Sequence, residues 1–175
     1  MDDHVKFDCS EQDLTALPAL PANMTKLNAQ MNKLPSLKGI DGHVGVQVLD
    51  ASDNAITALG EELAGCAALE ELLVYKNDIK EVGKAVNGAN LPALKVLNLF
   101  NNKLRKLPED VSTLGGLEEV NLAANKLMML ADGHFTGWGH VKILQLCERP
   151  ARSPSPPALP CPRSERRLPA RRKPQ

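Results

Sequence analysis

One pattern of hydrophobic and polar positions recurs along most of the chain. It reads L-x-x-L-x-L-x-x-N-x-L, with Val, Met, Ile or Ala replacing Leu at some positions, and its five full copies start at Met24, Val46, Leu69, Leu94 and Leu117. A sixth copy starts at Val141 and lacks the asparagine. The alternation of apolar and polar residues predicts a short strand in each copy. Copies spaced by 22 to 25 residues predict a solenoid, in which neighbouring coils bury each other's leucines.

The asparagine of the pattern stands at position 9 of each full copy. We expect these residues to form a structural asparagine ladder, made of Asn32, Asn54, Asn77, Asn102 and Asn125. An amide at the point where the chain leaves the strand can satisfy backbone groups of adjacent coils. Loss of a buried hydrogen-bond partner of this kind costs about 1 to 3 kcal/mol.

These motifs resemble those of leucine-rich-repeat proteins, over about residues 5–147. The resemblance implies an α/β repeat fold: a curved solenoid with a parallel β-sheet on its concave face and short helical, 3-10 or irregular segments on its convex face. The run Leu104, Leu107-Pro108, Val111, Leu114 is similar to the repeats of the plant intracellular Ras-group-related proteins. The first repeat, with Leu37-Lys38-Gly39-Ile40, looks more like the phosphatase-regulator subtype.

The pattern divides the chain into three parts. Residues 1–23 hold an imperfect leading turn, interpreted as an N-terminal capping turn, and residues 24–147 form the solenoid. Residues 148–175 contain eight of the thirteen prolines and very few large apolar side chains, so we expect a disordered, basic tail rich in Pro and Arg. Its arginines could direct nuclear localisation or make weak contacts with nucleic acid, or they could simply be solvated.

Charge and composition sharpen this division. The 21 basic and 21 acidic residues cancel over the whole chain, but residues 1–147 carry a net charge of −6 and the tail carries +6. No apolar run is long enough to span a membrane, and the first residues do not form a signal sequence. The four cysteines lie far apart, which favours reduced thiols over disulfides or a zinc site. We therefore expect a cytoplasmic monomer, with nuclear entry possible through the tail.

The candidate binding residues are those that face outward from the strands, at positions 2, 3, 5, 7 and 8. Tyr75 and Phe100, two of only five aromatic residues, share position 7 on consecutive strands and should lie about 5 Å apart. With neighbouring apolar side chains they would form a patch suited to a protein partner, although they could also merely cover the sheet. The predicted partner-binding residues are Tyr75, Phe100, Leu73, Val96, Asn98, Glu71, Asp50 and Glu119. The acidic ones would favour a basic partner segment or would simply be solvated.

Aromatic residues near the end of the repeats have a structural interpretation. Phe135 and Trp138 occupy positions equivalent to Val111 and Leu114, so we expect them in the core on the convex side, and Cys66 there as well. No catalytic, phosphate-binding or metal-binding motif is present. The sequence predicts no catalytic residues, no cofactor, no metal ion and no small-molecule substrate.

The function that fits these features is a non-catalytic protein-interaction scaffold in intracellular signal transduction. Two alternatives remain open at this point: a phosphatase-regulatory subunit, and a structural component of a cytoskeletal or ribonucleoprotein assembly. All three would use the outward face of the sheet to bind a protein whose identity the sequence does not reveal.

Overall fold

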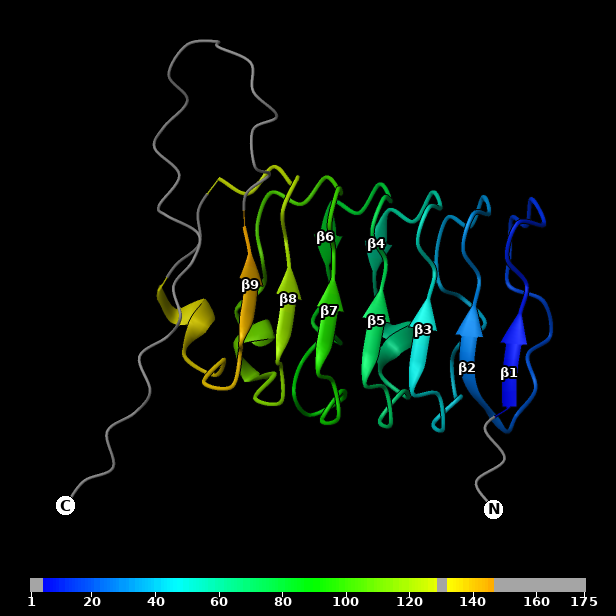
Figure 1. The fold of residues 1–175 in the computed structure, drawn as a ribbon, viewed down its shortest axis with the longest axis horizontal. Helices are drawn as coiled ribbons and strands as arrows, with labels where there is room; N and C mark the ends of the chain where they lie inside the picture. The colour runs from blue at the N-terminus through cyan, green and yellow to red at the C-terminus, as the bar shows by residue number, and fades with distance from the viewer. Residues whose placement is uncertain (1–4, 129–131, 147–175) are drawn as a thin grey trace, which may run out of the picture.

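A computed structural model describes residues 5–128 and 132–146 of the chain. The expected disordered tail, residues 148–175, lies outside the described residues. Within the described part, the chain winds into successive coils that each contribute one strand to a common sheet (Figure 1).

The main sheet has seven parallel strands in the order β1-β2-β3-β5-β7-β8-β9 (Figure 1). Each strand pairs with the one from the next coil, so every coil adds its strand beside the previous one. The strands are short, and they are Val5–Asp8 (β1), Met24–Asn28 (β2), Val48–Asp50 (β3), Glu71–Leu73 (β5), Val96–Asn98 (β7), Glu119–Asn121 (β8) and Ile143–Gln145 (β9).

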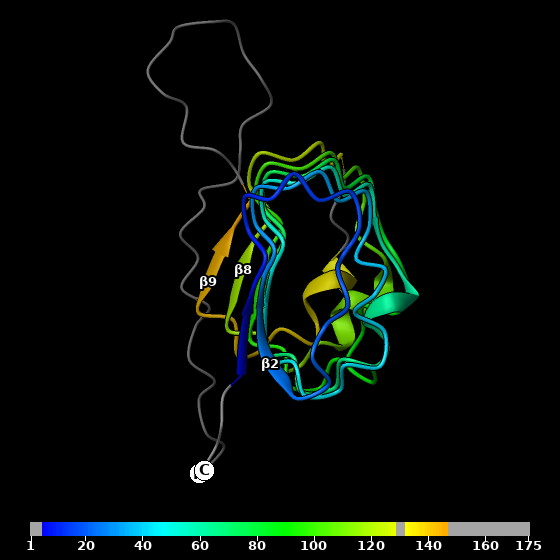
Figure 2. The same ribbon diagram turned by 90° about the vertical axis from the view of Figure 1, so that its right-hand side faces the viewer.

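Short 3-10 segments form the opposite side of the solenoid (Figure 2). Three 3-10 helices are described there, η1 (Glu61–Leu63), η2 (Glu109–Thr113) and η3 (Asp132–Phe135). Two short strands, β4 (Ala58–Leu59) and β6 (Glu81–Val82), pair in a separate parallel sheet. The predicted combination of a parallel sheet with short helical turns across from it is therefore confirmed.

The core is aliphatic, as the leucine pattern predicts. The residue at position 4 of each copy points inward, and Leu27, Leu49, Leu72, Leu97 and Val120 are at most 1% exposed. Burial of this kind is worth about 1.5 to 3 kcal/mol for each large aliphatic side chain. Because strands stack in register, each of these residues packs between its equivalents in the coils before and after it.

Trp138 fills the core across from the sheet, as expected from the alignment of the repeats. Its side chain is 2% exposed, and its indole Nε1 donates a hydrogen bond to the carbonyl oxygen of Val111 at 3.0 Å. The ring of Phe135 meets it edge to face, with centroids 5.4 Å apart. Cys66 is fully buried and occupies an aliphatic position in the same way. The prediction of a convex-side core for Trp138 and Cys66 is confirmed, and Phe135 packs against that core while partly buried.

The N-terminal segment adds a coil of its own. Strand β1 pairs with β2 so that Phe7 aligns with Leu27 and Asp8 with Asn28. In this register Cys9 takes the buried position 6, and it is 2% exposed. Gln12 takes the asparagine position. The segment interpreted as a capping turn thus carries a full strand, which the pattern obscured because Gln12 replaces the asparagine and the coil is 20 residues long.

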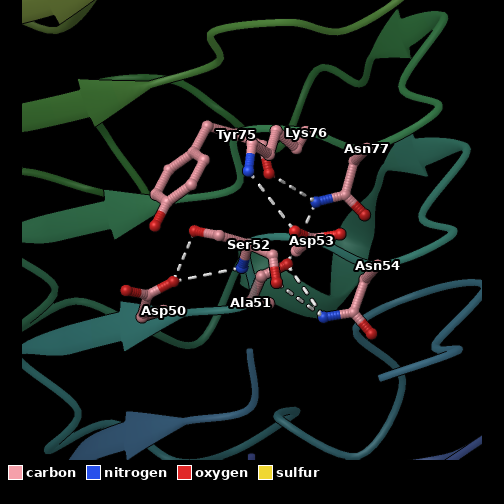
Figure 3. Close-up of polar contacts among 8 residues, drawn as sticks. All are labelled: Asp50, Ala51, Ser52, Asp53, Asn54, Tyr75, Lys76 and Asn77. Carbon is pink, nitrogen blue, oxygen red and sulfur yellow. Dashed lines mark hydrogen bonds and ion pairs between the residues drawn. The ribbon is translucent and has the colours of Figure 1, made fainter. Parts of the chain in front are cut away.

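The asparagine ladder connects successive coils (Figure 3). Asn77 Nδ2 donates to the carbonyl of Ala51 in the preceding coil at 3.0 Å, and to Val74 at 3.2 Å in its own coil. Asn77 Oδ1 accepts the N–H of Ile56 at 2.9 Å. The other four members, Asn32, Asn54, Asn102 and Asn125, make the same set of contacts with both coils. Each asparagine therefore stabilises the turn of its own coil and the junction with the preceding one.

The residue before each ladder asparagine has a left-handed backbone. Position 8 holds Met31, Asp53, Lys76, Asn101 and Ala124, whose φ angles lie between 52° and 56°. Non-glycine residues pay about 1 to 2 kcal/mol for this conformation. The chain adopts it in every full repeat because the turn places the asparagine amide between the two coils.

Candidate binding surface on the outer face of the sheet

The outer face of the sheet consists of the side chains at positions 3, 5 and 7, which point away from the core. Because the strands pair in register, equivalent residues form rows that cross the sheet. The position 3 row of strands β3 to β9 contains Val48, Glu71, Val96, Glu119 and Ile143. The spacing along such a row is about 4.7 to 4.9 Å per strand.

The position 5 row is a second set of side chains that hold the backbone. Asp or Asn occurs there in five strands, and each side-chain oxygen accepts the N–H two residues later at 3.0 to 3.2 Å. These residues are Asp8, Asn28, Asp50, Asn98 and Asn121. In β5 the position holds Leu73, whose side chain offers no acceptor to the N–H of Tyr75. Strand β5 therefore lacks a local hydrogen bond that these five strands make.

An apolar patch surrounds this exception. We define it as Leu73, Tyr75, Phe100, Val48 and Val96, all of which are half-buried on strands β3, β5 and β7 or directly after them. Leu73 aligns with Asp50 on one side and Asn98 on the other, so the patch has a polar border. Figure 3 shows that the side chains of Tyr75 and Asp50 lie on the opposite side of the turn from Asn54 and Asn77.

Asp50 differs from the solvated carboxylate that the sequence suggested. It is only 9% exposed, and its Oδ1 accepts hydrogen bonds from both the N–H and the hydroxyl of Ser52 (Figure 3). Its Oδ2 accepts a hydrogen bond from the side-chain amide of Gln30. Ser52 is itself fully buried, although its position 7 was expected to face outward. Asp50 thus borders the patch and holds the backbone together, and its carboxylate is occupied by hydrogen bonds to Ser52 and Gln30.

Two carboxylates at position 2, beside the outer face, form ion pairs with lysines of the next coil. Glu70 pairs with Lys95 at 2.6 Å and Glu118 with Lys142 at 2.6 Å. The hydrogen bond and positive charge of Lys142 hold the pKa of Glu118 below its ordinary value. The hydrogen bond from Lys95 to Glu70, together with its charge, raises the pKa of that ammonium group.

Glu71 and Glu119 are the two position 3 carboxylates, and neither forms an ion pair within the described residues. They stand on either side of Val96, with Glu71 half-buried and Glu119 exposed. The negative charge of Glu71 acts on Lys95 from a distance, as a small contribution to the raised pKa of that ammonium group. The outer face therefore combines apolar anchors with two carboxylates that are free to receive a cation.

Residues 5–128 and 132–146 show neither a metal-binding cluster nor a membrane-spanning helix. No three His, Cys, Asp or Glu side chains of these segments lie close enough together to hold a metal ion. None of the helices described there is long and apolar enough to cross a membrane. The predicted partner-binding residues Tyr75, Phe100, Leu73, Val96, Asn98, Glu71 and Glu119 lie together on one face, with Asp50 among them.

The coils and their ladder of asparagines define a solenoid built from leucine-rich turns, and comparisons with known proteins give the same class. The family model described as "Leucine Rich Repeat" matches residues 93–114. A leucine-rich-repeat protein of Leptospira interrogans superposes with a TM-score of 0.71 over 83% of this chain and 43% of its own, at 24% identity. At that identity the likeness establishes the fold alone.

Two curated relatives share more of the sequence. The mouse oligodendrocyte-myelin glycoprotein is 32% identical over 126 residues, which are 71% of this chain and 28% of that protein. The "Plant intracellular Ras-group-related LRR protein 8" of Oryza sativa subsp. japonica is 33% identical over 94 residues, which are 50% of this chain and 25% of the relative. The matched part therefore spans less than a third of either relative. These matches show that the chain is similar to leucine-rich-repeat proteins, whose solenoid fold it has and whose members generally mediate protein–protein interaction.

Proposed function

We propose that this protein is a non-catalytic scaffold in intracellular signal transduction, and that it docks a protein partner on the apolar patch of its outer face. The observation that carries the proposal is Leu73. Equivalent positions in five other strands hold Asp or Asn and satisfy a backbone N–H, whereas β5 gives up that hydrogen bond and presents a leucine to solvent. Local rules that are broken without a gain in packing tend to mark functional positions.

The chemistry of the patch suits an interface. Tyr75 and Phe100 sit at equivalent positions of neighbouring coils, so a partner could contact both rings at once. Interface residues that carry most of the binding energy are enriched in Tyr and cluster where a polar border excludes water. Asn98, Glu71 and Glu119 supply such a border here.

The intracellular setting is supported by the name of the rice relative, which is called plant intracellular and Ras-group-related. The non-catalytic character is supported by the outer face itself. Its polar groups are spread in rows across the sheet, whereas an active site needs reactive groups that converge in a pocket. Cytoplasmic localisation of the protein belongs to the same proposal.

The test is affinity capture with the full chain and with a Tyr75→Ala, Phe100→Ala double variant. We expect a partner, identified by mass spectrometry, that the unaltered chain captures and the double variant loses. Val44→Ala is the matched control, because Val44 is 64% exposed and lies in a loop before β3, outside the patch. Equal capture of the partner by the double variant, once its thermal stability is shown to be unchanged, would refute the proposal.

A further inference from the structure

The spacing of the carboxylates on the outer face determines which backbone conformation a peptide bound there can have. Along the position 3 row, carboxylates and apolar residues alternate from β5 to β9: Glu71, Val96, Glu119 and Ile143. Two strand spacings separate Glu71 from Glu119, which is about 9.4 to 9.8 Å. An extended β-strand crossing the sheet would repeat its side chains every second residue, at about 6.4 to 6.8 Å, and would fall out of step.

A polyproline II segment fits this spacing. It has three residues per turn and rises about 3.1 Å per residue, so side chains three apart on one face are about 9.3 Å apart. A ligand with basic residues at i and i+3 would therefore place one cation on each carboxylate. The apolar side chain of Val96 lies between them, against the turn of the ligand.

The chain itself contains such a sequence beyond the last described strand. Five prolines lie within residues 154–162, and Arg163 and Arg166 follow Pro162 three residues apart, with Ser164 and Glu165 between them. Three residues after Arg166, the same face of a polyproline II helix would carry Pro169. Two strands beyond β5, this proline would lie over β2, where the position 3 residue is Lys26. A proline there avoids the repulsion that a further arginine would meet.

We propose that residues 160–167 lie across the outer face of the sheet in cis, with Arg163 on Glu119 and Arg166 on Glu71. The inference rests on the proposed docking face and names an occupant for it. The tail would cover the acidic side of the apolar patch and compete with an external partner. Sixteen residues lie between Leu146 and Arg163, and at about 3.3 to 3.6 Å per residue this stretch is far longer than the distance to the neighbouring strand β8.

Three features make this contact specific and favourable. Glu70 and Glu118, the acidic residues at the neighbouring position 2, are already paired with lysines. They would therefore attract the arginines of the tail less strongly than Glu71 and Glu119 do. Tethering also raises the local concentration of a short segment to the millimolar range, so a contact that is weak between separate molecules becomes populated in cis. The net charges of −6 and +6 on the two parts act in the same direction.

The test uses a nitroxide spin label on Cys161 in the full chain, with Cys147 changed to Ser. Cys9 and Cys66 are buried, and burial raises the pKa of the Cys66 thiol to about 11 and that of Cys9 above its ordinary value, so neither competes for the reagent. Tyr75 is the only tyrosine, and its ring signals in the NMR spectrum report on the outer face. We expect the label to broaden these signals at about 0.01 M salt and to release them at about 1 M, where the Debye length falls from about 30 Å to about 3 Å.

Matched pairs of variants test the register. Arg163→Gln with Arg166→Gln should restore the Tyr75 signals at low salt, whereas Arg171→Gln with Arg172→Gln removes the same charge and should leave them broadened. In the same way, Glu71→Gln with Glu119→Gln should restore the signals, and Glu70→Gln with Glu118→Gln should not.

Three results would overturn the proposal. They are Tyr75 signals that stay sharp at low salt, equal release by both arginine pairs, and broadening of an unlabelled chain by a labelled one in a mixed sample, which would mean contact between molecules. Sharp Tyr75 signals together with loss of partner capture in the Tyr75→Ala, Phe100→Ala variant would reject the tail contact and retain the proposed function.

Discussion

The asparagine ladder gives the sharpest prediction about stability. Asn102 is 5% exposed, and Asn102→Ala removes four hydrogen bonds. The N–H of Ile79 loses its partner, which was the Asn102 side-chain oxygen at 3.0 Å. The three carbonyls that Asn102 served, Val74, Leu99 and Phe100, each keep another donor.

The expected cost follows from this difference. One orphaned buried N–H costs about 1 to 3 kcal/mol, and each of three bonds to carbonyls that keep another partner contributes about 0.5 kcal/mol, at the lower end of the usual range. Asn102→Ala should therefore lower the free energy of unfolding by about 2.5 to 4.5 kcal/mol. Urea denaturation followed by the fluorescence of Trp138, the only tryptophan, measures it.

The neighbouring residue provides the matched control. Asn101 is exposed and has a φ of 53°, a conformation that glycine adopts without strain. Asn101→Gly should change the free energy of unfolding by less than about 0.5 kcal/mol. The reasoning is refuted if Asn102→Ala costs no more than about 1 kcal/mol, or if the two variants lose equal stability.

Further predictions concern the backbone, the core, the ion pairs and the thiols. Ala124→Gly should raise the free energy of unfolding by up to about 1 kcal/mol, since Ala124 has a φ of 56°; a loss of stability in urea denaturation would contradict this. Leu97→Ala should lower it by about 2 to 5 kcal/mol in the same assay, because Leu97 is 1% exposed; a loss below 1 kcal/mol would contradict close packing. Lys142→Met should raise the pKa of Glu118 toward its ordinary value in a carboxyl NMR titration, and an unchanged pKa would show that the ion pair does not form in solution. Since folding lowers that pKa, the pair stabilises the fold at neutral pH, and its contribution is lost as the pH falls through the folded-state pKa. Cys66 should resist iodoacetamide at pH 8 until the protein is unfolded, because burial raises its pKa to about 11, and rapid native labelling would disprove its burial.

The periodic part of the fold could be predicted from the sequence because each repeat contains the same pattern of leucines and asparagine. The leucines at position 4 and the asparagines at position 9 occupy the positions that the pattern gave them. The coil around β1 was missed as a repeat, since Gln12 breaks the motif while Cys9 and Leu14 still take its inward positions. The packing of inward side chains determines the path of that coil, and packing tolerates more substitutions than the sequence motif does.

The candidate surface was predictable as a set of positions, but its electrostatics were not. Alternation placed Glu70 and Glu71 near the outer face without distinguishing them, and the structure pairs only Glu70 with Lys95. The repeat numbering gives the register between β5 and β7, but which of the two carboxylates the Lys95 ammonium reaches depends on side-chain conformation. The burial of Asp50 likewise depends on Gln30, a residue 20 positions away in the preceding coil.

The most direct test of the docking surface is site-specific photo-crosslinking. A photoreactive phenylalanine analogue in place of Tyr75 should form a covalent adduct with the captured partner, and the same group in place of the exposed Val44 should not. Binding through the outer face of the sheet predicts an adduct at position 75 alone. An adduct that forms at position 44 and is absent at position 75 would contradict it.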